Sequence, residues 1–254
     1  MDYELELTRL YMEQERTQAD GYLHAHSRNR AVIRRQIVIF ERCIPYLRDA
    51  RVVLDWGCRH AADACLMRML RGADVQLEAC DIEDLNFRAF FDFAGLRYTR
   101  LTHPYRLPYD DNQFDAVIGG GVLEHVPNDS ASLTELHRVI RPDGHLVVTM
   151  LPNCGSYTEW LNRRLGNPHH LRLYSLREIR HMFIHHGFIP VASGYHQMIP
   201  ALSSCLRGIF DSPLANGLVE SLFVLNAPLE RVPLLNRLAT NLFIVGRKVE
   251  AIHG

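Results

Sequence analysis

The segment RVVLDWGCRHA, residues 51–61, places an aspartate and a glycine at the end of a short β-branched run. Asp55 closes the run, Gly57 opens a turn, and the residues after Ala61 have helical composition. In a strand–loop–helix unit the first N–H groups of the helix lack intrahelical partners, so they can bind anionic or polar groups of a ligand. The segment therefore predicts either a nucleotide-cofactor loop or an ordinary turn of a parallel α/β protein, and these residues alone do not decide between the two.

Polar and glycine residues also follow three later strand-like runs. They are Asp81 after VQLEAC, His103 and Pro104 after the third run, and Gly119 to Gly121 with Glu124 and His125 after the fourth. Ligands of doubly wound sheets bind outside the carboxyl ends of the strands, so we expect these residues at one edge of the sheet. The Asp81 carboxylate suits two hydrogen bonds from a ribose diol, and it equally suits a helix cap.

Strands and helices alternate along the segments that must position these residues. The pattern predicts strands at 51–55, 74–80, 96–101, 114–119, 144–151, 188–193 and 241–249, and helices at 61–71, 84–94 and 130–141. Ser132 with Glu135, and Ser175 with Glu178, fit capping boxes of two helices. Strands separated by helices imply a mostly parallel sheet covered on both faces.

Two further regions lie outside this alternation. Residues 1–48 predict an N-terminal pair of helices broken near Gly21, with four arginines (28, 30, 34 and 35) that are interpreted as a solvated polar face in preference to an anion-binding patch. Residues 195–239 carry four prolines between short apolar stretches. A lid, a dimer surface and an interfacial helix are alternatives for this segment, with core packing as the default.

Composition excludes several classes of function. The chain has 28 basic and 29 acidic residues, so it lacks the charge excess that holds a polyanion, which argues against nucleic acid as a partner. Six cysteines without a CxxC pair indicate reduced thiols. No apolar leader or 18-residue apolar run is present, which predicts a cytoplasmic protein without stable membrane insertion. Adjacent histidines diverge, so no metal site is expected.

Four segments in order, VVLDWGC, EACDIED, LPYDDNQFDAVIGGGVLEHVPN and LTELHRVIRPDGHLVVTMLPN, resemble class I S-adenosylmethionine-dependent methyltransferases of the small-molecule type. The resemblance covers residues 50–195. It implies a doubly wound, seven-stranded, mostly parallel Rossmann-like sheet whose last strand, 241–249, inserts antiparallel between the fifth and sixth. It also implies a methyltransferase domain over 49–254, with insertions at about 152–174 and 195–239, and a helical cap over 1–48.

The same resemblance assigns cofactor contacts residue by residue. Asp55 and Gly57 would frame the methionine moiety, Asp81 would hold the ribose hydroxyls, and Ile82 would pack on adenine. His103 stands where the family has an acidic residue for the adenine amine, a contact that a neutral imidazole nitrogen can still accept. The remaining candidates are Cys58, Arg59 and Pro104, together with Gly119 and Gly120 on the methyl-sulfonium side.

Two glycines of the family's first motif are replaced by Arg59 and Ala61. Glycine permits positive φ there, so Arg59 either takes an ordinary backbone conformation or costs roughly 1 kcal/mol or more in strain. Its side chain either pairs with the cofactor carboxylate or points to solvent. These departures motivate an alternative, a catalytically silent binding or scaffold domain. A nicotinamide-dependent oxidoreductase is disfavoured because GxGxxG is absent.

Methyl transfer from a sulfonium needs an aligned acceptor and the removal of its proton. His125 follows the fourth strand and is interpreted as a general base or as a structural histidine. His170, within NPHHLRLYS, matches a histidine of relatives that modify glycan or lipid-linked precursors, and it is the stronger candidate for contacting the acceptor. We therefore expect methylation of an oxygen, with nitrogen or carbon as alternatives, on a small molecule or a glycan or lipid precursor; a homodimer is left open.

Overall fold

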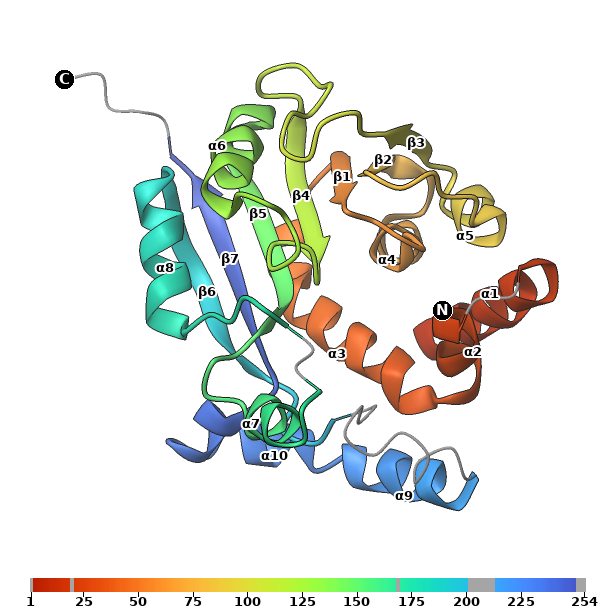
Figure 1. Ribbon diagram of the computed structural model, residues 1–254. Helices are drawn as coiled ribbons and strands as arrows, with labels where there is room; N and C mark the ends of the chain where they lie inside the picture. The colour runs from red at the N-terminus through yellow and green to blue at the C-terminus, as the bar shows by residue number, and fades with distance from the viewer. Residues whose placement is uncertain (1, 19–20, 168–169, 201–212, 250–254) are drawn as a thin grey trace.

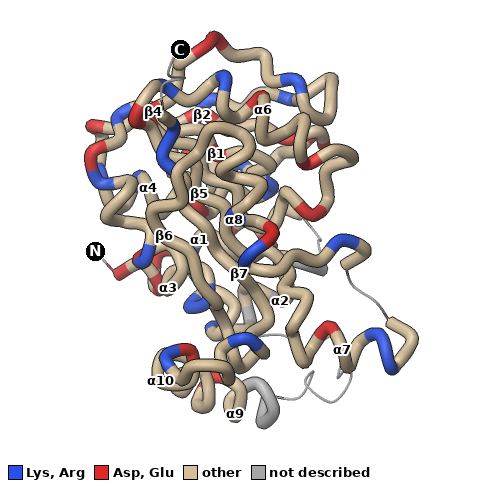
Figure 2. Tube along the Cα trace, turned by 90° about the vertical axis from the view of Figure 1, so that its left-hand side faces the viewer, with Lys and Arg blue, Asp and Glu red and all other residues tan. Residues whose placement is uncertain are grey.

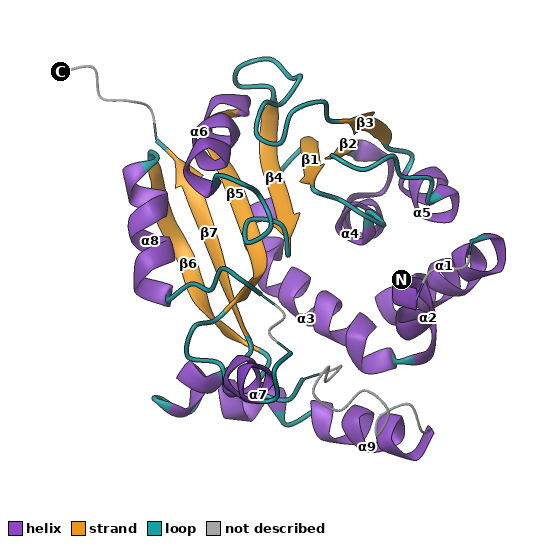
Figure 3. Ribbon diagram, in the orientation of Figure 1, coloured by secondary structure: helices purple, strands orange, loops and turns teal. Residues whose placement is uncertain are grey.

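The computed structural model describes residues 2–18, 21–167, 170–200 and 213–249, and its centre is a seven-stranded sheet. The strand order is β3-β2-β1-β4-β5-β7-β6, and β7 is antiparallel to both β5 and β6 (Figures 1 and 3). The strands are β1 Val52–Trp56, β2 Gln76–Asp81, β3 Arg97–Arg100, β4 Phe114–Gly120, β5 Ile140–Pro152, β6 Phe188–His196 and β7 Asn241–Lys248. The predicted fold class, including the inserted antiparallel strand, is confirmed.

Helices cover both faces of the sheet. They are α1 Tyr3–Thr17, α2 Gly21–Arg28, α3 Arg30–Leu47, α4 Ala62–Arg71, α5 Arg88–Ala94, α6 Asp129–Val139, α7 Tyr157–Arg164, α8 Leu176–His185, α9 Pro213–Phe223 and α10 Asn226–Glu230, with short 3-10 turns η1 Gly72–Asp74 and η3 Leu235–Leu238. One core joins α1, α3, α4 and α5 to the sheet, and a second joins α6 and α8 to its other face. In β1, Val53 packs in the first core and Leu54 in the second, which explains the continuous apolar run of a strand buried on both faces.

The N-terminal helices number three among the described residues, one more than predicted. Asn29 ends α2 and starts α3, because its side chain accepts a hydrogen bond from the Ala31 N–H at 3.0 Å. Two of the four arginines, Arg30 and Arg34, pair with Glu4 of α1, and their side chains stay 58% and 37% exposed. Arg35 lines the cavity described below. The domain boundaries at 48/49 stay a prediction.

One predicted capping box is absent and another is present, although the start predicted for the first helix, residue 130, lies one residue from the observed start. Helix α6 begins at Asp129, because Asn128 accepts from the Ala131 N–H at 2.9 Å. Ser132 lies inside the helix, and Glu135 instead accepts from the Leu107 N–H and pairs with Arg138. The Ser175–Glu178 capping box is present at α8 as predicted.

The long segment 195–239 lies partly outside the described residues. Its described part includes α9, whose Phe223 and Val219 pack against Ala31, Val32 and Val38 of α3. Within the described ranges, no helix is long and apolar enough to cross a membrane. Basic and acidic residues are interspersed over the elements in Figure 2. Cys43, Cys58, Cys65, Cys80 and Cys154 are free thiols, and Cys205 lies outside the described residues.

Candidate functional site

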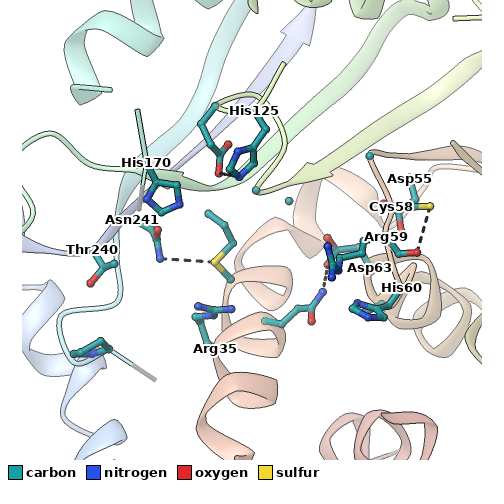
Figure 4. Close-up of a pocket in the computed structure, with 18 of the residues that line it drawn as sticks. Arg35, Asp55, Cys58, Arg59, His60, Asp63, His125, His170, Thr240 and Asn241 are labelled. Carbon is teal, nitrogen blue, oxygen red and sulfur yellow. Dashed lines mark hydrogen bonds and ion pairs between the residues drawn. The ribbon is translucent and has the colours of Figure 1, made fainter. Parts of the chain in front are cut away.

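A cavity of about 420 Å³ lies at the carboxyl ends of β1 and β4, where the strand order reverses. Its walls come from α3, the loop after β1, the start of α4, the loop after β4, helix α7 and the residues before β7. Figure 4 shows His125 and His170 on one side, Asp55, Cys58, Arg59 and Asp63 on the other, and Arg35 reaching in from α3. This is the place where the topology of a doubly wound sheet puts a ligand.

The loop after β1 keeps the backbone path of a glycine-rich loop despite its substitutions. Gly57, Arg59 and Ala61 have φ values of 65°, 41° and 57°. The N–H groups of Gly57 and Cys58 donate to the Cys80 carbonyl at 2.8 and 3.2 Å. Left-handed backbone costs a non-glycine residue roughly 1–2 kcal/mol, so the fold holds Arg59 and Ala61 there at that expense. The strained alternative for Arg59, rather than the ordinary conformation, is the one observed.

Gly57 is the position of this loop where a side chain would fit least well. A Cβ there would lie 2.5 Å from Cγ1 of Val122, at the start of the loop after β4. Gly57→Ala is expected to lower the free energy of unfolding by about 2–4 kcal/mol, from positive φ plus overpacking. Chemical denaturation measures this change. Gly95→Ala is the matched control, since its φ is 58° but its Cβ would meet nothing closer than 3.5 Å; equal losses in both variants would contradict the packing role of Val122.

Two carboxylates face the cavity beside this loop, that of Asp55 buried and that of Asp63 half-buried. Asp55 accepts from the Ala64 N–H at 3.1 Å, and Asp63 accepts from the Gln36 side chain at 3.3 Å. Burial raises the pKa of Asp55 well above its usual value, and burial raises the pKa of Asp63 to about 6. Gly120 allows this approach, because a Cβ there would lie 2.9 Å from Oδ2 of Asp63. Such a pair is costly when charged and is stabilised by a cationic ligand.

Glutamates and histidines form a cluster on the opposite wall. Oε1 of Glu124 lies 3.7 Å from Nε2 of His125, and the His125 and His170 rings are 5.9 Å apart. Burial raises the pKa of Glu124 to about 7. Burial and then the charge of His170 lower the pKa of His125, whereas the hydrogen bond with Glu159 raises the pKa of His170. That bond joins Nδ1 of His170 to Oε1 of Glu159 at 2.8 Å.

The structure brings together some of the sequence candidates and separates others. Those that line the cavity are Asp55, Gly57, Cys58, Arg59, Gly120, His125 and His170. The others, Asp81, Ile82, His103, Pro104 and Gly119, are not among its lining residues. Gly119 instead packs against the Trp56 ring, which a Cβ would approach to 2.8 Å, and Gly121 lines the cavity. The cofactor and catalytic roles assigned to all these residues stay predictions.

Asp81 and His103 lie outside the residues that line the cavity. The Asp81 carboxylate accepts from the Arg59 N–H at 3.1 Å and from the Glu83 N–H at 3.2 Å, so it holds the β1 loop to the end of β2. Each carboxylate oxygen can accept a second hydrogen bond, which leaves capacity for a diol. His103 accepts from the Tyr105 N–H at 3.4 Å and lines a separate surface hollow with Arg106 and Glu135.

Several cavity residues were not among the sequence candidates. Glu159 and Asn162 come from α7, Asp63 from the first turn of α4, and Asn241 from the start of β7. Glu124 was recognised only as a polar residue after β4. Arg35 belongs to the arginine cluster, and its buried Nε has no hydrogen-bond partner among the described residues. The signal for Arg35 was present in that cluster, but the favoured interpretation placed it in solvent.

Residues 25–193 match the family model of a methyltransferase domain. The chain belongs to this methyltransferase family. A "probable S-adenosylmethionine-dependent methyltransferase" of Mycobacterium tuberculosis is 26% identical over 159 residues, which cover 63% of this chain and 56% of the relative. The fatty-acid O-methyltransferase of Mycolicibacterium smegmatis is 32% identical over 133 residues, covering 52% and 47%. The chain thus spans about half the length of these curated relatives.

A solved structure supports the same fold. The Burkholderia thailandensis 1,6-didemethyltoxoflavin N1-methyltransferase, with its substrate and S-adenosylhomocysteine bound, has a TM-score of 0.58 at 16% identity and covers 98% of this chain and 89% of its own. The resemblance to class I S-adenosylmethionine-dependent methyltransferases, inferred from four sequence segments, is confirmed. The oxidoreductase alternative is wrong for a member of this family.

Proposed function

We propose that the chain is an S-adenosylmethionine-dependent methyltransferase that methylates an oxygen of a small molecule or of a glycan or lipid precursor. The observation that carries this proposal is one cavity with two different walls: the glycine-bearing ends of β1 and β4 with the carboxylates of Asp55 and Asp63, and the histidine cluster opposite them. S-adenosylmethionine is cationic at its sulfonium and its ammonium, so Asp55 and Asp63 suit it. The fatty-acid O-methyltransferase among the relatives favours oxygen and a lipid-like acceptor.

The reaction needs little from the protein beyond the alignment of the methyl donor and the acceptor. The acceptor oxygen forms a bond to the methyl carbon, the carbon–sulfur bond breaks with its electron pair staying on sulfur, and the hydroxyl proton leaves. A cavity that holds both reactants in line supplies most of the rate. His125 and His170, the predicted catalytic residues, line the wall opposite the carboxylates, where an acceptor hydroxyl would lie.

Calorimetric titration with S-adenosylmethionine and S-adenosylhomocysteine tests the cofactor. Saturable heat at micromolar ligand is expected, and no heat at high micromolar concentration would contradict the proposal. An acceptor screen with methyl-labelled cofactor, using fatty acids, hydroxylated lipids and sugar precursors, then tests the acceptor. Cofactor binding without transfer to any acceptor would instead support the silent binding domain; the left-handed path at Arg59 and Ala61 removes one reason for that alternative.

Arg35 bears on the choice among acceptors. Its guanidinium lines the cavity, and its Nε is buried without a partner among the described residues, which favours an anionic group such as a carboxylate. Arg35→Met is expected to raise KM for an anionic acceptor about tenfold, the equivalent of one charge-assisted hydrogen bond. Steady-state kinetics measure KM, and calorimetry with S-adenosylhomocysteine is the control. If the variant loses cofactor affinity and keeps KM, Arg35 contacts the cofactor and not the acceptor.

A further inference from the structure

A buried carboxylate and two histidines converge at the acceptor side of the cavity. Glu124, His125 and His170 each offer one ligand atom, and these three atoms lie within 4.8 Å of one another. Two nitrogen or oxygen ligands of one divalent transition-metal ion, each at about 2.0–2.2 Å, are at most about 4.4 Å apart. The Glu124–His125 pair at 3.7 Å already meets that limit. The His125 side chain is 62% exposed, so it has room for the small rotation that would bring its ligand nitrogen within the same limit of His170.

Glu124 provides an independent reason to place a cation here. Its side chain is only 2% exposed, it lines the cavity, and its Oε2 atom is buried without a hydrogen-bond partner among the described residues. A buried carboxylate oxygen without a donor is unusual, because the desolvation cost is then uncompensated. Coordination to a metal ion would satisfy that oxygen.

Glu159 holds His170 in the manner of a metal-binding histidine. Its Oε1 bonds Nδ1 of His170 at 2.8 Å, and Glu159 is itself buried in α7. A carboxylate on one ring nitrogen fixes the orientation of the imidazole and makes the other nitrogen, Nε2, a better metal ligand. His170 thus has the carboxylate–histidine arrangement that supports metal ligands in proteins.

We propose that Glu124, His125 and His170 bind a first-row divalent transition-metal ion, with Glu159 as the positioning residue for His170. Two imidazoles and one carboxylate suit zinc, cobalt, iron or manganese ions and do not suit the all-oxygen preference of magnesium or calcium. Three protein ligands leave a position open toward the cavity. The sequence expectation of no metal site rested on adjacent histidines and did not consider this group, which joins two loops that are distant in the sequence.

The role of the ion rests on the proposed function. An acceptor hydroxyl bound at the open position would become more acidic, as water does on a metal ion. Its proton passes to water in the cavity, the resulting alkoxide forms the carbon–oxygen bond, and the carbon–sulfur electron pair returns to sulfur as a neutral thioether. No oxidant or reductant is required.

Titration of chelator-treated protein with Co²⁺, followed by visible absorption, and with Zn²⁺, followed by calorimetry, tests the site. A single ion per chain is expected. His170→Asn should abolish this binding, and Glu159→Gln should weaken it about 10- to 100-fold, the usual effect of removing a carboxylate behind a metal-bound histidine. His185→Asn, at the exposed last residue of α8, is the matched control and should bind as the wild type does.

Two results would overturn the site: no saturable one-to-one binding by the wild-type chain, or equal losses in His170→Asn and His185→Asn. Circular dichroism checks that the variants are folded. S-adenosylhomocysteine is titrated into the same preparations without metal. Cofactor binding without metal binding overturns this inference alone, whereas metal binding without cofactor binding overturns the proposed methyltransferase function and leaves the metal site standing.

Discussion

Replacing Asp81 with asparagine is expected to weaken the binding of S-adenosylmethionine and S-adenosylhomocysteine about 100-fold. In the proposed complex the Asp81 carboxylate accepts two hydrogen bonds from the ribose diol. Bonds to a charged group contribute about 1.5–3 kcal/mol each, so losing the charge and one acceptor removes about 3 kcal/mol. The asparagine oxygen can still accept one of the two backbone bonds, from Arg59 or Glu83, that hold the loop. Calorimetry measures the affinity, and thermal unfolding checks the fold.

Two comparisons separate ribose recognition from the capping role of Asp81. Asp84→Asn removes a neighbouring, exposed carboxylate from the same loop and should leave the affinity unchanged. A cofactor analogue without the ribose hydroxyls should bind the wild type and the Asp81→Asn variant equally, since the lost contacts are shared. Equal affinity of the wild type and Asp81→Asn for the intact cofactor would show that Asp81 is only a loop cap.

Much of the fold was readable from local sequence because it depends on local physics. Val53 and Leu54 are buried on opposite faces of the sheet, and the apolar run Val52 to Leu54 reflects that burial. The capping residue of α6 was misassigned because Asn128 and Ser132 are both good caps, and only the structure shows which of them lies outside the helix. Such choices differ by about 1 kcal/mol, so tertiary context decides them.

The candidate site was only partly readable, because it depends on segments that are distant in the sequence. Asp55 lies near the end of β1, Gly57 follows β1 and His125 follows β4, and strand ends can be located from the pattern. Glu159 lies on the polar helix α7, and its neighbours predict nothing about a contact with His170. Arg59 and Ala61 are the opposite case. Their residue types disfavour a left-handed backbone, yet both retain it in the structure.

Asp63→Asn is expected to raise the free energy of unfolding and to weaken the binding of the cofactor. In the folded chain, burial raises the pKa of Asp63 from 3.8 to about 6. The folded state therefore binds the proton more tightly than the unfolded state, and the free energy of unfolding falls as pH rises from about 4 to 6. Above that range the ionised carboxylate costs on the order of 1–2 kcal/mol, since one pKa unit is about 1.4 kcal/mol and the group is partly open to the cavity.

The asparagine variant removes that cost, because its amide stays neutral and its oxygen can still accept from Gln36. Denaturation between pH 4 and 7 should show a pH-dependent fall in the free energy of unfolding of the wild type that is smaller in Asp63→Asn. Asp74→Asn, which replaces an exposed carboxylate, is the control.

Cofactor affinity of Asp63→Asn at pH 7.5 should fall about tenfold, or about 1.4 kcal/mol. If only S-adenosylmethionine is weakened, the carboxylate faces the sulfonium; if S-adenosylhomocysteine is weakened equally, it faces the ammonium. A variant that keeps full affinity for both would contradict the role of the carboxylate pair in holding a cationic cofactor.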